Sequence, residues 1–305
     1  MSELDDYLEK TASALELLAD LFLSPKESCQ PVNDQDYSVP CNVDRRSLST
    51  STGSEDPYYW VQFTAFAYIA EAANELRSLA VLIRARLFTG TLGPVVRAVV
   101  ERVGIVCWIL ELNQDTDASD RAYRAMLNML YSSKQYRSAI GRLDPPRAAV
   151  RELEGVHRTT RADVVRWFAP HPDPTAPKEE TLWERKGEKY PELTDFGAIA
   201  LSGSSRDAIH RGVYAALCGM THPNIAVSAE KTQGGEPGSI VFVHKGDHVD
   251  RVVRLAIVAF SRGLQYLARY FLTETSFDEI TQDLRNISAG FEDAATRMRA
   301  AGDQR

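Results

Sequence analysis

Four side chains that could carry acid–base or phosphate chemistry fall within residues 204–224, in the segment SSRDAIHRGVYAALCGMTHPN. They are Arg206, His210, Tyr214 and His222. Most of this set lies broadly along one side of a predicted helix, because spacings of four and eight residues return to the same face. Histidine transfers protons near neutral pH, and a nearby arginine can stabilise the charge that develops on a phosphate. We expect these four to be catalytic; the alternative is that each histidine is structural, with His222 capping the helix C-terminus.

A second candidate set begins in the most apolar stretch of the chain, residues 92–112. A helix without a polar face is normally buried on every side, so Arg97 and Glu101, one turn apart, are predicted to form a buried ion pair. Such a pair could bind a substrate carboxylate or phosphate, or keep a catalytic carboxylate ionised. The residues expected to bind substrate are Arg97, Glu101, Trp108 and Arg124. The alternative is that the pair only ties this helix to Arg121 or Arg124.

Two segments have the acidic-x-x-His spacing of di-iron helical bundles: Glu154 with His157, and Asp207 with His210. Such bundles also need a lone glutamate from each of two further helices, and the order along this chain lacks the expected alternation. We predict no metal ligands and no cofactor, with a carboxylate-bridged metal site as the alternative.

The charge balance limits the partners that the chain could bind. A formal net charge of −7 disfavours broad electrostatic binding of DNA or anionic lipid, which needs a dense Lys/Arg surface.

Residues 92–112 are long enough to cross a membrane, but ionised residues near the middle would each cost about 2.5–3.5 kcal/mol at the bilayer centre. The N-terminus, MSELDDYLEK, is acidic where a secretory signal would be basic and then apolar. These features predict a cytoplasmic protein that does not enter membranes.

The common signatures of several enzyme classes are missing from the sequence. No phosphate-binding G-x-x-x-x-G-K-[ST] loop, G-x-G-x-x-G after a strand, or G-x-S-x-G elbow occurs. Nucleotide hydrolysis, Rossmann redox chemistry and serine hydrolysis are therefore disfavoured. The four cysteines are too few for a disulfide scaffold and are expected to be reduced thiols.

The elements that must position these residues are nearly all helical. Apolar spacings of three and four predict an amphipathic helix over 3–23, and the Ser-, Asp-, Asn- and Pro-rich stretch 25–55 predicts a mobile loop. The other predicted helices cover 57–88, 92–112, about 119–141, 145–168, 206–220, 249–272 and 277–301, with one or two short helices at most in 179–201. Residues 225–229 and 239–244 predict two short strands joined by a Gly-rich turn.

This pattern predicts an all-α, elongated multi-helix bundle with a small β-hairpin insertion near 225–244. The predicted organisation is an N-terminal amphipathic helix (1–24), a flexible linker (25–56) and a single helical-bundle domain (57–303). We expect the functional centre where the helix of Arg97 and Glu101 meets the helix that starts at residue 206.

Three blocks of sequence carry a resemblance to known proteins. They are R-A-V-V-E…W-I-L over 97–110, D-R-A-Y-R over 120–124 and Y-A-A-L-C-G-M-T-H-P over 214–223. Residues 57–272 resemble a widespread group of uncharacterised bacterial helical proteins. The resemblance implies a helical fold and an importance of these positions, but no reaction, because that group has no settled activity.

The helical core is in turn similar to the HEPN domain, a small helical bundle that often acts as a metal-independent ribonuclease in toxin and phage-defence systems. Those nucleases carry an arginine, a polar residue and a histidine at a short spacing. Arg206, Asp207 and His210 supply the three residue types, with one residue fewer between arginine and histidine than the pattern requires. The resemblance implies that His210 is the general base, that Arg206 stabilises the phosphorane charge and that the pocket forms between two subunits.

Three function classes remain open. The first expectation is a HEPN-like helical effector that cleaves RNA without a metal in a toxin or defence setting. The alternatives are a helical enzyme, metal-dependent or not, that modifies a small molecule in a polar pocket of the bundle core, and a non-catalytic regulatory or interaction protein. The expected partners are a second copy of the chain and an RNA or small-molecule ligand.

Overall fold

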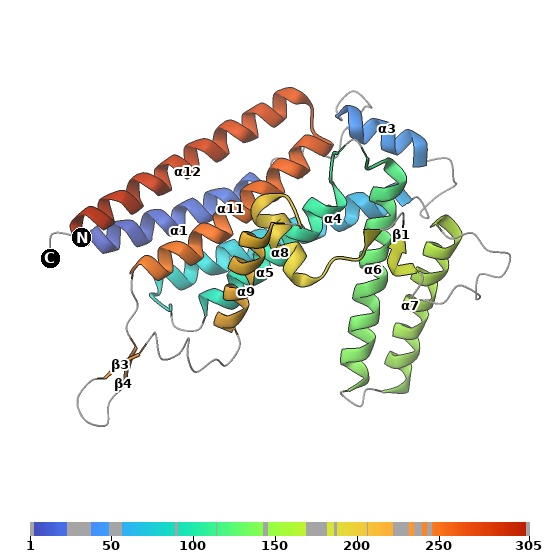
Figure 1. Ribbon diagram of the computed structural model, residues 1–305, viewed down its shortest axis with the longest axis horizontal. Coiled ribbons are helices and arrows are strands. Elements are labelled where there is room, and N and C mark those ends of the chain that lie inside the picture. The colour runs from blue at the N-terminus through green and yellow to red at the C-terminus, as the bar shows by residue number, and fades with distance from the viewer. Residues whose placement is uncertain are drawn as a thin grey trace. The chain divides into compact units, whose positions relative to one another are not determined.

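Helices make up nearly all of the described chain in the computed structural model (Figure 1). The structure describes residues 3–22, 38–48, 57–88, 91–113, 115–142, 146–168, 182–185, 188–205, 207–221, 232–234, 240–242 and 246–302. The predicted all-α multi-helix bundle is confirmed. The chain divides into two compact units: Met1–Val39, Phe66–Trp108 and Glu192–Arg305 form unit 1, and Pro40–Ala65 and Ile109–Pro191 form unit 2.

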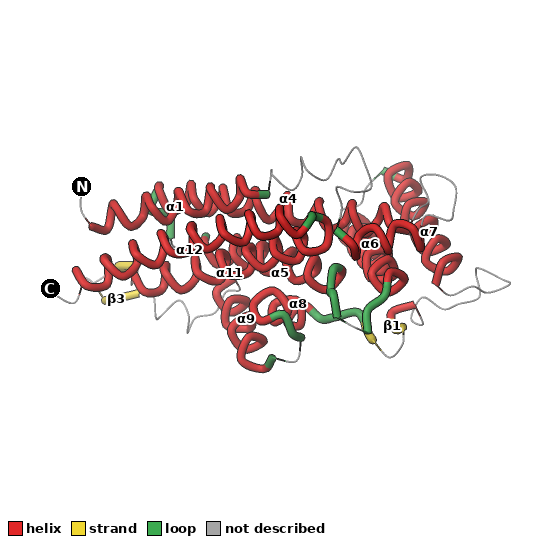
Figure 2. Tube along the Cα trace, turned by 90° about the horizontal axis from the view of Figure 1, so that it is seen from above, coloured by secondary structure: helices red, strands yellow, loops and turns green. Residues whose placement is uncertain are grey.

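Three helices of unit 1 that are far apart in the sequence lie side by side. They are α1 (Glu3–Leu21), α11 (Gly246–Phe271) and α12 (Glu274–Gly302). Figures 1 and 2 show the three helices running next to one another. The Tyr7 hydroxyl on α1 donates to Asp250 Oδ1 on α11 at 3.0 Å, across 243 residues of sequence. The apolar faces predicted by the helical spacing are therefore buried against one another.

The remaining helices of unit 1 are α4 (Pro57–Arg84), whose first nine residues belong to unit 2, α5 (Leu92–Ile109), α8 (Leu193–Ser202) and α9 (Ala208–Thr221). Gly263 of α11 lets that helix come close to α4 and α5, since a Cβ at this position would lie 2.7 Å from Ile69 Cδ1 and 3.1 Å from Val103 Cγ1. A short antiparallel ladder joins β3 (Thr232–Gly234) to β4 (Ile240–Phe242).

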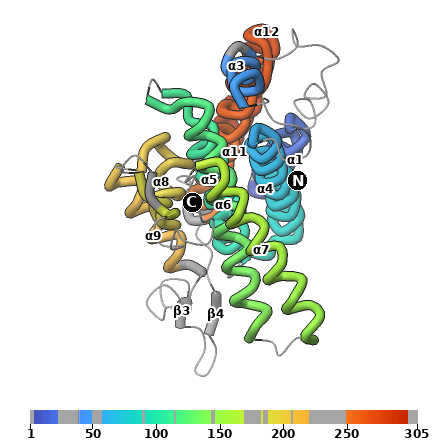
Figure 3. Tube along the Cα trace, turned by 90° about the vertical axis from the view of Figure 1, so that its right-hand side faces the viewer, coloured from blue at the N-terminus to red at the C-terminus, as the bar shows by residue number. Residues whose placement is uncertain are grey.

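Unit 2 is built around an antiparallel pair of helices, α6 (Ala118–Gly141) and α7 (Arg147–Phe168), which run alongside each other in Figure 3. Their pairing is fixed by a ring contact between Tyr123 and Phe168 at 5.4 Å and by Ser133 Oγ, which lies 2.9 Å from His157 Nδ1. Helix α6 begins at a capping box, in which Asp117 Oδ1 accepts the backbone N–H of Asp120 and Asp120 Oδ2 accepts that of Asp117.

The structure corrects the prediction of a loop over 25–55. Residues 39–48 form a helix, α3 (Val39–Leu48), and the rest of that stretch up to residue 56 lies outside the described residues apart from Ser38. Cys41 and Asp44 of α3 are buried, and the Cys41 thiol lies 2.8 Å from the Tyr58 hydroxyl. Contacts distant in sequence hold α3 in place, which the polar composition of the segment did not indicate.

Smaller differences concern the ends of elements. The helix predicted over 57–88 ends at Arg84, and the helix predicted from 206 begins at Ala208. The second predicted strand (239–244) is described at 240–242, whereas the first (225–229) lies outside the described residues. A two-residue ladder between β1 (Glu184–Arg185) and β2 (Glu188–Lys189), in unit 2, was not predicted.

Candidate functional site

Three of the predicted site residues meet on one carboxylate oxygen in unit 1. Arg97 Nε on α5 donates to Glu101 Oε1 at 2.6 Å, as the spacing of four residues predicts. The Tyr214 hydroxyl on α9 donates to the same Oε1. The helix of Arg97 and Glu101 therefore contacts the helix of Tyr214, as expected for the functional centre.

The side chains of this cluster are more exposed to solvent than predicted. The side chains of Arg97 and Glu101 are each 23% exposed, so the expectation of a fully buried pair is corrected to a half-buried one. The hydrogen bond from Arg97 to Glu101 raises the pKa of the guanidinium further above its ordinary value. Burial, and then the hydrogen bond to Glu101, raises the pKa of the Tyr214 phenol, which stays a neutral donor.

Two glycines explain how α5, α8 and α9 come close enough for this contact. A Cβ at Gly104 on α5 would lie 2.1 Å from the Phe196 carbonyl oxygen on α8, and one at Gly197 would lie 2.2 Å from the Tyr214 ring. Trp108, a predicted site residue, is 4% exposed and packs edge-on against Phe196 at 5.7 Å. Trp108 is thus a packing residue of this three-helix contact.

His210 lies at the start of α9, where Asp207 holds the backbone and approaches the ring. Asp207 Oδ1 accepts the backbone N–H groups of Ile209 and His210 at 3.0 and 3.1 Å, which is the role of a helix N-cap. Asp207 Oδ2 lies 2.9 Å from His210 Nδ1, and the hydrogen bond from the His210 backbone is the main cause that lowers the Asp207 pKa.

The same face of α9 carries His210, Tyr214 and Cys218 at successive spacings of four residues. The His210 side chain is 36% exposed, its Nδ1 atom is buried, and neither ring nitrogen has a hydrogen-bond partner among the described residues. A neutral imidazole oriented in this way can accept a proton from a substrate. The other two predicted catalytic residues, Arg206 and His222, lie outside the described residues.

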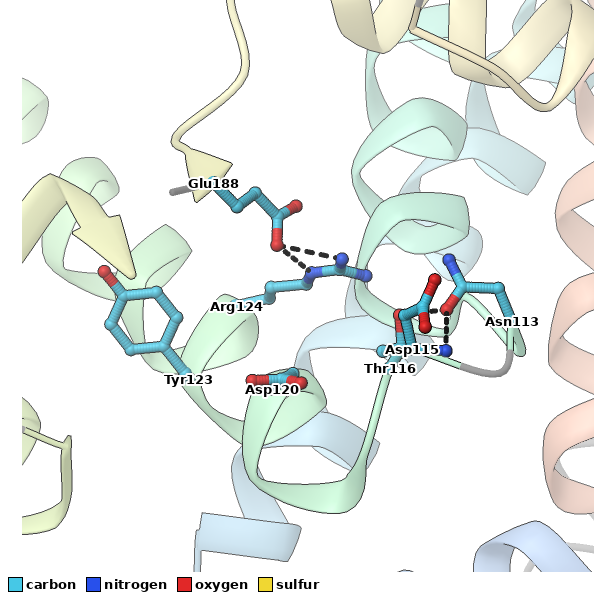
Figure 4. Close-up of a pocket in the computed structure, with 7 residues that line it drawn as sticks. All are labelled: Asn113, Asp115, Thr116, Asp120, Tyr123, Arg124 and Glu188. Carbon is cyan, nitrogen blue, oxygen red and sulfur yellow. Dashed lines mark hydrogen bonds and ion pairs between the residues drawn. The ribbon is translucent and has the colours of Figure 1, made fainter. Parts of the chain in front are cut away.

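Arg124, the remaining predicted site residue, forms a different cluster in unit 2. Its guanidinium donates from Nη1 to Glu111 Oε2 at 3.0 Å. It also donates from Nη2 to Glu188 Oε2 at 2.9 Å (Figure 4). The expected grouping of Arg124 with the Arg97–Glu101 pair is therefore corrected: its carboxylate partners are those of unit 2. Sequence patterning missed Glu188, because a two-residue strand gives no periodic signal.

A pocket of about 280 Å³ lies beside Arg124. Its lining residues are Asn113, Asp115, Thr116, Asp120, Tyr123, Arg124 and Glu188. Asn113 Oδ1 accepts the backbone N–H of Asp115 and the Thr116 hydroxyl, which shapes one wall (Figure 4). The pocket can hold a small polar molecule.

A buried ion pair in unit 2 was also missed. Arg121 Nε and Nη2 donate to the two carboxylate oxygens of Asp44 at 2.6 and 2.8 Å, and both side chains are at least nine-tenths buried. Arg121 also donates to the carbonyl oxygens of Glu111 and Thr116. The sequence analysis named Arg121 only as a possible partner of the Arg97–Glu101 pair. It missed Asp44 because the helix that carries Asp44 was not predicted.

The described part of the chain contains no candidate metal site. No group of three or more His, Cys, Asp and Glu side chains there could hold a metal ion. Of the two acidic-x-x-His segments, Glu154 and His157 belong to unit 2, and Asp207 and His210 to unit 1. Cys41, Cys107 and Cys218 are free thiols.

Comparisons of the chain with family models, curated proteins and solved structures found no match. No helix within the described ranges is long and apolar enough to cross a membrane.

Proposed function

We propose that this chain is a HEPN-like helical effector that cleaves RNA without a metal ion, with His210 as the general base. The observation that supports this proposal is the Asp207–His210 pair. Asp207 caps α9, and its carboxylate lies 2.9 Å from His210 Nδ1, so one negative charge lies next to both the helix start and the imidazole. Nε2 is then the proposed proton acceptor.

The proposed reaction uses the ribose 2′-hydroxyl as nucleophile. His210 Nε2 takes the proton of that hydroxyl, the 2′-oxygen bonds to the adjacent phosphorus, and the bond from phosphorus to the 5′-oxygen breaks. The leaving oxygen takes a proton from water, which yields a 2′,3′-cyclic phosphate and a 5′-hydroxyl. Arg206 is proposed to stabilise the negative charge on the phosphorane.

The cluster of Arg97, Glu101 and Tyr214 is proposed to position α9 and not to touch the RNA. Its Tyr214 hydroxyl lies one helical turn beyond His210 and is held by Glu101. A fixed α9 keeps the imidazole in one place relative to a bound phosphate, and small displacements of a catalytic group reduce rates strongly.

Cleavage of a single-stranded RNA oligonucleotide in excess EDTA tests the proposal. His210→Ala should lower the rate about 10²–10⁴-fold, the usual contribution of a general base. Asp207→Asn should give a smaller loss, and an oligonucleotide with a 2′-deoxyribose at the cleavage site should not be cut there. The matched control is Asp163→Asn, which alters a carboxylate paired with Arg166 three residues later on α7 and should cleave like the wild type. Equal cleavage by wild type and His210→Ala, or no cleavage by the wild type between pH 6 and 9, would refute the proposal.

The pocket beside Arg124 favours a second candidate function, the binding or modification of a small polar molecule in unit 2. The Arg124 side chain is only 6% exposed, and pockets of a few hundred Å³ suit small ligands. Native mass spectrometry of the purified protein would detect a retained molecule, and Arg124→Met should lose it. A wild-type mass equal to that of the bare chain, with no ligand recovered, would remove this candidate.

We also propose that the effector is a cytoplasmic homodimer. Aromatic side chains left exposed on α4, Tyr59 at 48% and Phe63 at 44%, support an interface, since aromatic residues are enriched in subunit contacts. Native mass spectrometry gives the subunit count directly, and a monomer at all concentrations would contradict this part of the proposal.

A further inference from the structure

Arg262 on α11 is a cation without a described acidic partner. Its Nη1 atom is buried and has no hydrogen-bond partner in the described residues, and no ion pair there includes this side chain. Arg254, two helical turns earlier on α11, contrasts with it, since it pairs with Asp250 at 2.8 Å and also with Glu292. A buried, unpaired guanidinium nitrogen is costly, so its retention calls for a reason.

The groups around Arg262 do not neutralise it. Its charge acts on the Cys107 thiol, but burial raises the pKa of that thiol to about 12, so the thiol is neutral near pH 7. The C-terminus of α8 carries a partial negative charge that favours a nearby cation without occupying its N–H donors. The Nη1 donor of Arg262 therefore lacks an acceptor, which a negatively charged group could supply.

Arg262 lies next to the turn that leads to the proposed catalytic pair. Gly203 ends α8 with a φ of +82°, and a Cβ on it would lie 3.5 Å from Arg262 Nη1 and 3.6 Å from the Tyr266 hydroxyl. The turn then folds back, because the Asp207 N–H points to the Ser204 carbonyl at 3.4 Å. Turns of this kind bring their ends within about 7 Å, so Arg262 and Tyr266 face the same loop that presents Asp207.

We propose that Arg262, assisted by the Tyr266 hydroxyl, forms an anion subsite at the α8–α9 turn that binds a phosphate group of the RNA. Guanidinium binds phosphate through two parallel N–H donors, which gives affinity and orientation together. The identification of the phosphate as part of RNA rests on the proposed function, whereas the anion subsite itself does not.

The first experiment measures RNA binding in a His210→Ala background, which prevents cleavage, with EDTA present. Adding Arg262→Met should weaken the binding of a short single-stranded RNA about 10-fold or more. It should also reduce the slope of log K against log[salt] by about 0.7, the value for one phosphate contact on a single strand. Arg269→Met is the matched control, because it removes an exposed arginine of the same helix and should leave both quantities near those of the parent. An Arg262→Met protein with the parent's affinity and slope overturns the proposal.

The second experiment uses inorganic phosphate alone and separates this proposal from the proposed function. Phosphate should raise the Tm of the wild type and of Arg269→Met, and should not raise that of Arg262→Met. If no RNA binds but this pattern holds, the subsite stands and the RNA-cleaving function fails. If phosphate acts equally on all three proteins, the subsite is refuted.

The stability of the variant completes the test. Without phosphate, Arg262→Met should be at least as thermostable as the wild type, because the substitution removes a buried guanidinium nitrogen that has no acceptor. Arg262→Lys, which keeps the charge and loses the paired donors, should fold and show an intermediate RNA affinity. An Arg262→Lys protein that binds RNA no better than Arg262→Met, or a destabilised Arg262→Met whose loss is fully explained by unfolding, counts against the proposal.

Discussion

Glu101 is the residue on which the proposed centre depends, because one of its oxygens accepts hydrogen bonds from both Arg97 and Tyr214. The carboxylate joins α5 to α9 while leaving part of the ion pair in contact with water. Removal of the carboxylate would leave a phenol hydroxyl and a guanidinium without this acceptor. The loss of an acceptor for buried donors costs about 1–3 kcal/mol each.

Glu101→Ala is expected to lower the free energy of unfolding by about 1–3 kcal/mol, measured by urea denaturation followed by circular dichroism. RNA cleavage per folded molecule should fall as well, since α9 loses its tie to α5. Asp293→Asn is the control, because it alters a carboxylate that pairs with Arg297 at the same spacing but on an exposed surface, and it should change stability by less than about 0.5 kcal/mol. A Glu101→Ala protein as stable as the wild type would show that the hydrogen bonds do not hold α9.

At this scale, sequence reasoning succeeded where partners are close in the chain. The pairing of Arg97 with Glu101 was predicted from a spacing of four residues. Arg124 was assigned to the wrong group, because its partner Glu188 is 64 residues away and helical periodicity does not encode such contacts.

At the scale of elements, the close packing of α5, α8 and α9 depends on two glycines. The predicted Cβ positions at Gly104 and Gly197 clash with backbone and with an aromatic ring at 2.1 and 2.2 Å. Gly155 on α7 has no atom near its Cβ position within the described structure, so it offers a comparison in which only helix propensity changes.

Gly104→Ala and Gly197→Ala are each expected to destabilise the protein by more than about 1 kcal/mol, since α5, α8 and α9 must separate to admit a methyl group. Gly155→Ala should instead stabilise it by about 0.5–1 kcal/mol, because alanine favours the helix. Thermal and urea unfolding measure all three. A Gly104→Ala variant as stable as Gly155→Ala would contradict the close packing of α5 on α8.

Most helices could be predicted as elements, whereas two features of unit 2 could not. The segment of α3 is polar and carries a proline, and its helix is fixed by burial of Cys41 and by the Asp44–Arg121 pair. The ladder of Glu188 has strands of two residues, too short for any alternation of polar and apolar residues. Both features depend on partners distant in the sequence.

At the scale of the whole molecule, burial extends the pH range over which several phenols and thiols stay neutral. Burial raises the pKa of the Tyr7 and Tyr214 phenols, and raises the thiol pKa of Cys41 to about 11 and that of Cys107 to about 12. A folded-state pKa above the unfolded value gives stability that is complete below the unfolded pKa and is lost as pH rises towards the folded one.

The protein is therefore expected to lose stability in alkali, with the Tm falling from about pH 8.5, the ordinary thiol pKa, to about pH 12. Cys107→Ala should flatten this fall between pH 9 and 12, even if its Tm at pH 7 is lower. Cys218→Ala, which removes a less buried thiol, is the control. Tm values measured by circular dichroism across this range test the prediction, and an unchanged slope in Cys107→Ala would contradict it.

The order of segments in unit 1 means that α1 is synthesised well before the helices that it packs against. Residues of α1 pack against α11 and α12, and the Tyr7–Asp250 bond spans 243 residues, whereas all of unit 2 lies between them in the sequence. On a ribosome, which adds about 5–20 residues each second, the apolar side of α1 emerges long before its partners exist. We therefore expect the apolar face of nascent α1 to remain exposed during the synthesis of unit 2 and to be accessible in that time to chaperones that bind amphipathic helices.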